Sequence, residues 1–150
     1  MGNTQNTSAC SPLASKWSWT LLITLAFMAL AAACHRETRD EALLREAKTF
    51  TQNECPKEVE PFVTMDSMTY NPAESTMTYS YTVGGELDQD ELYDDALQET
   101  FYENILRKVK NSIDMRRMKD ERLTFVYRYM SRKSGREYFN VCITPEDYGK

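Results

Sequence analysis

The chain has 150 residues, of which 41% are hydrophobic and 27% charged, which is the range of one globular domain with an appendage. Its 18 basic and 23 acidic residues give a net charge of −5. A net acidic chain has no long-range attraction for phosphates, so nucleic acid is not expected as a partner.

Residues 1–33 differ from the rest of the chain. Residues 1–16 are polar with one basic residue, Lys16, and residues 17–33 read WSWTLLITLAFMALAAA. This apolar stretch is at the lower limit of the length that crosses a bilayer, about 20 residues. A basic residue followed by a short apolar stretch that ends in small residues is typical of a secretory signal peptide. We therefore predict that residues 1–33 are a signal peptide, with an uncut membrane anchor or a buried helix as alternatives.

Leu30 and the three alanines before Cys34 resemble the lipobox of bacterial lipoproteins. In that family the cysteine is diacylglycerylated, the peptide is cut immediately before it, and the new amino terminus usually carries a further acyl chain such as palmitate. The resemblance implies that Cys34 is the lipidation site. It also implies that residues 34–150 are a membrane-anchored domain of the cell envelope, on the inner or outer membrane, with membrane lipid as partner through acylated Cys34. Two or three acyl chains hold a protein on a membrane far more firmly than one.

The first predicted helix begins at a capping box formed by Thr38 and Glu41. It should end by Asn53, because the residue before Pro56 is disfavoured in a helix. Its apolar face is formed by residues at helical spacing, namely Leu43, Ala47 and Phe50.

A hairpin is predicted next, with strands at residues 63–70 and 76–83 around a polar turn at 71–75. In the second strand, apolar and aromatic residues alternate with Thr and Ser, which indicates one buried and one exposed face. The residues expected on the buried face are Met77, Tyr79, Tyr81 and Val83.

A long helix is predicted from about Asp88 to Met118, with an apolar residue at every fourth position. This stripe consists of Tyr93, Leu97, Phe101, Ile105, Val109 and Ile113. Two further strands, 123–130 and 136–143, would form a closing hairpin, and Thr144 with Pro145 indicates a final helical turn. The predicted fold is thus an α+β domain of order α-β-β-α-β-β, in which a four-stranded, mainly antiparallel sheet has two helices packed on it.

Three short motifs also resemble small uncharacterised exported proteins of gut-type bacteria: Cys55-Pro56, Tyr79-Ser80-Tyr81 and Ser134-Gly135. This resemblance implies no activity.

After removal of residues 1–33 and lipidation of Cys34, the domain would keep two cysteines, Cys55 and Cys142. The cell envelope is oxidising enough for a disulfide between them. Because geometry decides bonding, a bridge and two separate thiols remain equal alternatives.

Catalytic chemistry has little basis in this sequence. The one histidine, His35, adjoins the predicted anchor, so the domain cannot assemble a nucleophile–histidine pair, and zinc-type ligand spacing is missing. We therefore expect no cofactor and no metal. A small envelope hydrolase that uses paired carboxylates remains the alternative.

Charge is distributed unevenly along the chain. Residues 107–136 contain 11 basic and 3 acidic residues, whereas residues 34–106 contain 5 basic and 17 acidic ones. A basic surface of this kind is either simply solvated or meets an anionic envelope component or protein. Its candidate residues are Arg107, Lys108, Lys110, Arg116, Arg117 and Lys119. The sequence thus favours a lipid-anchored cell-envelope protein that works as a non-enzymatic binding or assembly module.

Overall fold

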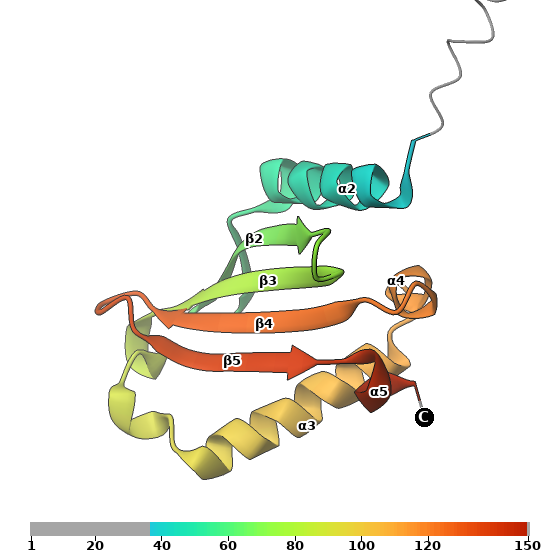
Figure 1. Ribbon diagram of the computed structural model, residues 1–150. Coiled ribbons are helices and arrows are strands. Elements are labelled where there is room, and N and C mark those ends of the chain that lie inside the picture. Colours follow the sequence, from blue (N-terminus) through green and yellow to red (C-terminus); the bar gives the residue numbers. More distant parts are fainter. Residues whose placement is uncertain (1–36, 150) are drawn as a thin grey trace, which may run out of the picture. The chain divides into compact units, whose positions relative to one another are not determined.

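The computed structural model describes residues 37–149 (Figure 1). The predicted signal peptide and Cys34 lie outside these residues. In chain order the elements are α2 (Arg39–Glu54), β1 (Lys57–Glu60), β2 (Val63–Asn71), β3 (Thr76–Val83), the 3-10 turns η1 (Gly85–Leu87) and η2 (Asp90–Leu92), α3 (Asp95–Asn111), α4 (Arg116–Asp120), β4 (Thr124–Ser131), β5 (Glu137–Ile143) and α5 (Pro145–Tyr148).

The α+β class is confirmed, but the sheet differs from the prediction in two respects. It has five strands in the order β1-β2-β3-β4-β5, because the short strand β1 joins the edge of β2. It is also mixed, since β3 and β4 pair in parallel while the other neighbours are antiparallel. The reason is the connection from β3 to β4, which passes through α3 and so returns the chain to the same end of the sheet.

The predicted long helix is wrong in its extent. Helix α3 begins at Asp95, because the Asp94 side chain caps it by accepting a hydrogen bond from the Leu97 backbone N–H at 2.8 Å. Residues 90–92, which were expected in the helix, form the 3-10 turn η2. The helix stops at Asn111, and Ile113 lies beyond it with 84% of its surface exposed. With α4 and α5, the described residues contain four α-helices rather than two.

Helix α2 begins at the predicted capping box and lies beside β2 (Figure 1). Leu43 and Ala47 are buried in the core. The Thr51 hydroxyl group donates to the Met68 carbonyl at 2.7 Å and accepts from the Met68 N–H at 2.8 Å. Since β1 pairs only with the start of β2, this helix satisfies backbone groups that β1 leaves unpaired.

The hydrophobic core lies on one face of the sheet. Met77 and Val83 are buried, and Tyr79 and Tyr81 are partly buried against the core, as the alternation predicted. The tyrosines of β3 stack on those of β4, with ring centroids 5.0 Å apart for Tyr79–Tyr127 and 4.6 Å for Tyr81–Tyr129; we call these four residues the tyrosine ladder. Within residues 37–149, none of the helices has both the length and the apolar character needed to cross a membrane.

Candidate binding groove

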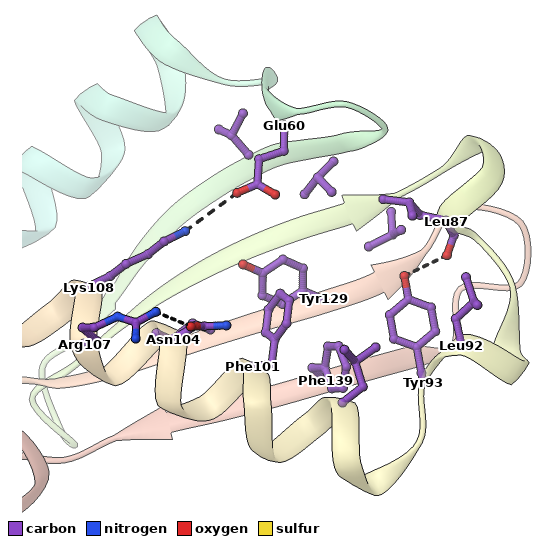
Figure 2. A pocket seen from close by; sticks show the side chains of 15 residues that line it. Glu60, Leu87, Leu92, Tyr93, Phe101, Asn104, Arg107, Lys108, Tyr129 and Phe139 are labelled. Carbon is purple, nitrogen blue, oxygen red and sulfur yellow. Dashed lines mark hydrogen bonds and ion pairs between the residues drawn. The ribbon is translucent and has the colours of Figure 1, made fainter.

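A groove of about 600 Å³ lies between β1, the sheet and α3 (Figure 2). One wall is formed by Val59 and Glu60 of β1, and the other by α3 residues such as Leu97 and Lys108. The 3-10 turns close one end of the groove with the side chains of Leu87 and Leu92. This volume lies within the range of ligand sites in proteins.

The walls of the groove are apolar and open to solvent. Val59 and Leu92 are each 44% exposed, Leu87 is 40% exposed and Leu97 is 36% exposed. These four residues belong to a group of seven large hydrophobic side chains that are exposed in the described part of the chain. Their gathering around one hollow indicates a binding surface, because scattered apolar side chains need no explanation but clustered ones do.

Aromatic rings form the floor. Phe101 of α3 stacks on Phe139 of β5, with ring centroids 4.8 Å apart, and meets Tyr129 edge-on at 5.0 Å. Burial raises the pKa of the Tyr129 hydroxyl group, and the neighbouring Tyr81 adds to this shift. Tyr129 is therefore neutral at every physiological pH, which keeps the floor uncharged.

Charged side chains stand on the rim. The Lys108 ammonium group and the Glu60 carboxylate are 3.7 Å apart across the groove, with side chains that are 76% and 65% exposed (Figure 2). Arg107 donates a hydrogen bond to the Asn104 side chain at 2.5 Å. An ion pair this exposed stabilises the protein by at most about 1 kcal/mol. A ligand can therefore separate the two side chains at little cost.

Asp88 fixes the end of the groove formed by the 3-10 turns. Its buried carboxylate accepts hydrogen bonds from the Ser131 hydroxyl at 2.6 Å, the Tyr138 hydroxyl at 2.7 Å and the Lys133 backbone N–H at 2.9 Å. These bonds, that from Ser131 first, lower the pKa of Asp88. Tyr93 stacks on Tyr138 at 3.8 Å, so this end of the groove is attached to the β4–β5 hairpin.

The predicted basic surface is divided among several roles. Arg107 and Lys108 lie on the rim of the groove. The Lys119 ammonium group instead donates to the carbonyls of Val109, Lys110 and Ser112 at 2.8 to 2.9 Å, which satisfies the C-terminal end of α3. Arg117 forms an ion pair with Glu46. Lys110 and Arg116 are exposed to solvent outside the groove.

The two candidate disulfide cysteines are both free thiols in the structure. Cys55 precedes β1 at one edge of the sheet, whereas Cys142 is exposed on β5, the opposite edge strand. Of the two alternatives, the structure therefore has separate thiols rather than a bridge. The pKa of each thiol is raised, chiefly by burial.

The alternative hydrolase receives no support from the site. Its mechanism would place two acids in one pocket, one of them with a raised pKa. Among residues 37–149, Glu60 is the one acid that lines the groove, and the pKa values of Asp88 and Asp147 are both lowered. In the same part of the chain, no three metal-ligating side chains are grouped together.

The groove could not be predicted from the sequence because its walls come from segments with weak patterns. Val59 stands alone among the charged residues of β1, Leu87 precedes the predicted helix, and Leu92 falls in the acidic stretch at the start of that predicted helix. An isolated apolar residue within a charged segment was the one available signal.

Residues 38–139 match the model of a family described as a domain of unknown function, DUF8479, and the chain belongs to that family. No curated protein matches the sequence. A candidate secreted protein from Pseudomonas aeruginosa is 8% identical with a TM-score of 0.59, over 75% of this chain and 97% of that one. EpsS, a pilotin from the type 2 secretion system of Vibrio vulnificus, is 10% identical with a TM-score of 0.53, over 73% of this chain and 90% of that one. At these identities the likeness establishes a shared fold.

Proposed function

We propose that this DUF8479 protein is a lipid-anchored module of the bacterial cell envelope that holds an apolar segment of a partner envelope protein in its groove. The observation that carries the proposal is the gathering of exposed Val59, Leu87, Leu92 and Leu97 around one hollow. Burying such side chains against a partner releases about 25 cal/mol for each Å² of apolar surface. Covering the groove would therefore be favourable.

The shared fold is compatible with this role. One structural neighbour is a candidate secreted protein and the other is a pilotin of a secretion system, so the fold is used by proteins associated with export. We extend to this chain the general role of an envelope or assembly module, without assigning it a particular secretion system.

The proposed anchor also fits the position of the groove. Cys34 precedes Thr38 by four residues, which span at most about 14 Å, so α2 would begin close to the membrane. Helix α2 has 16 residues and a length of about 24 Å. In the chain, the β1 wall of the groove follows the C-terminal end of α2, whereas the proposed anchor precedes its N-terminal end.

The anchor is tested by the intact mass and membrane partitioning of the natively expressed protein. We expect a chain that begins at Cys34, carries two or three acyl groups and partitions with membranes. Cys34→Ala should be neither acylated nor cut at this position. An unmodified full-length chain in both samples would refute the anchor and leave the groove untouched.

Partner binding is tested by co-purification after chemical cross-linking in native membranes. Leu97→Asp places a charge in the groove wall and should abolish recovery of the partner, because the buried carboxylate would be unpaired. Ile113→Asp is the matched control, because Ile113 is also an exposed aliphatic residue but lies beyond the C-terminal end of α3 and outside the groove. Equal recovery with both variants would contradict the proposed role of the groove.

A further inference from the structure

We infer that the groove accepts an amphipathic α-helix of the partner protein, with acidic side chains beside the apolar stripe and on the side next to α3. This inference rests on the proposed function, and it adds the conformation and the charge of the bound segment. It follows from the edge strand beside the groove, from the nature of the walls and from the charges on the rim.

An extended partner strand is disfavoured by the structure of β1. This edge strand has only four residues, all exposed, and three of them carry charges: Lys57, Glu58 and Glu60. Its register is interrupted by a bulge between Glu58 and Glu60. Short length, charges and bulges are the features that prevent an edge from pairing with another chain.

A helix suits the groove because it needs no backbone partner. The walls and floor consist of side chains such as Val59, Leu97 and Phe101, which offer apolar contact and few hydrogen bonds. A helix satisfies its own peptide groups and presents apolar residues at positions i, i+3, i+4 and i+7. Binding of such a stripe in a hydrophobic groove is a recurrent mode of peptide recognition.

The rim charges determine the orientation of the polar flank. Arg107 and Lys108 extend from α3 on one side, and the carboxylate of Glu60 stands on the other (Figure 2). Acidic side chains of the partner would be attracted to the α3 side and repelled from the β1 side. Rim charges of this kind select and orient a partner more than they add affinity.

A lipid chain is the competing occupant, and the charges on the rim argue against it. An acyl chain could contact Val59, Leu87 and Leu92, but it carries no acidic group to meet Arg107 and Lys108.

The test is photo-cross-linking in the native cells with p-benzoylphenylalanine at Leu92 of the full chain, followed by sequencing of the captured peptide. We expect a peptide with apolar residues at i, i+3, i+4 and i+7 and with Asp or Glu beside them. The yield should fall about tenfold in the double variant Arg107→Glu, Lys108→Glu, because two attractive contacts become repulsive. The control, Lys110→Glu with Arg116→Glu, reverses two exposed charges outside the groove and should keep the yield.

The remaining outcomes separate this inference from the proposed function. A captured peptide with alternating apolar residues, an adduct with the mass of an acyl chain, or a yield unchanged by the rim reversal would overturn the acidic helix while leaving the groove as a binding site. No adduct above that obtained with the same photoreactive residue at Ile113 would overturn the proposed function itself.

Discussion

The buried carboxylate of Asp88 has a structural role. Its hydrogen bonds from Ser131, Tyr138 and Lys133 join the 3-10 segment to the β4–β5 hairpin. Because the segment carries Leu87, the same bonds hold one end of the groove in place.

Asp88→Asn should lower the free energy of unfolding by about 1 to 3 kcal/mol, because the amide cannot accept all three bonds and leaves a buried donor unsatisfied. Chemical denaturation measures this loss. Asp90→Asn is the control, since Asp90 forms an exposed ion pair with Arg136 and should change stability by less than about 1 kcal/mol. Equal losses would show that Asp88 has no special structural role.

Acid should destabilise the domain by protonating the carboxyl groups of Asp88 and Asp147. Hydrogen bonds lower the pKa of Asp88, from Ser131 first, and of Asp147, from the Thr144 backbone first, below the usual 3.8. Folding therefore favours the ionised carboxyls, and their stabilisation is full above about pH 4 and lost as the pH falls through the folded-state pKa values. Denaturation curves at several pH values should show this fall, and the double variant Asp88→Asn, Asp147→Asn should show a shallower one. An equally steep fall in that variant would assign it to other groups.

Gly85 is required by both its backbone and its surroundings. Its φ of +57° is costly for other residues, and a Cβ there would overlap the Phe62 ring. Gly135 has a similar φ of +68° but nothing within 4 Å of a Cβ. Gly135→Ala should therefore cost about 1 kcal/mol of unfolding free energy and Gly85→Ala about 1 to 3 kcal/mol more. Equal thermal and chemical stability of the two variants would exclude the steric contribution of Phe62.

At the level of elements, the C-terminal end of α3 depends on a side chain from α4. Lys119→Met removes a cation that donates to three carbonyls, and we expect a loss of about 1 to 3 kcal/mol in chemical denaturation. Arg116→Met, on the same short helix but exposed, should change stability by less than about 0.5 kcal/mol. Similar effects of the two substitutions would mean that the three hydrogen bonds do not stabilise the junction.

The sequence predicted the elements that have strong local patterns. Thr38 with Glu41 located the start of α2, and the alternation in β3 identified its buried face, because capping and period are local properties. The apolar stripe from Tyr93 to Ile113 was extended too far, since the helix boundaries depend on the Asp94 cap and on the exposure of Ile113. Strand β1 was missed because its four residues are all exposed and mostly charged.

The groove and the parallel pairing were harder to predict because they depend on distant segments. The parallel register of β3 and β4 results from the crossover through α3. The groove combines Val59, Leu92 and Leu97, which are separated in sequence and come together only when α3 packs on the sheet. Charge counts along the chain likewise grouped Lys119 with Arg107, although one satisfies a helix end and the other lies on the groove rim.

At the scale of the whole molecule, the proposed anchor and the β1 wall of the groove are connected through opposite ends of α2. The proposed lipid at Cys34 would hold the start of the helix at the membrane, and the β1 wall of the groove follows the end of the helix. The tyrosine ladder and the aromatic floor share Tyr129, so the ring packing beneath the groove is continuous with the stacking between β3 and β4.

Occupancy of the groove in living cells is the most direct test of this account. Leu97→Cys and Ile113→Cys would each be introduced into a chain that also carries Cys55→Ser and Cys142→Ser, and the rates of labelling with a small maleimide compared in cells and in the protein purified from those cells. We expect the ratio of the Leu97→Cys rate to the Ile113→Cys rate to be at least about tenfold lower in cells, which corresponds to about 1.4 kcal/mol of protection. The same ratio in cells and in purified protein would show an unoccupied groove and contradict the proposed binding of a partner.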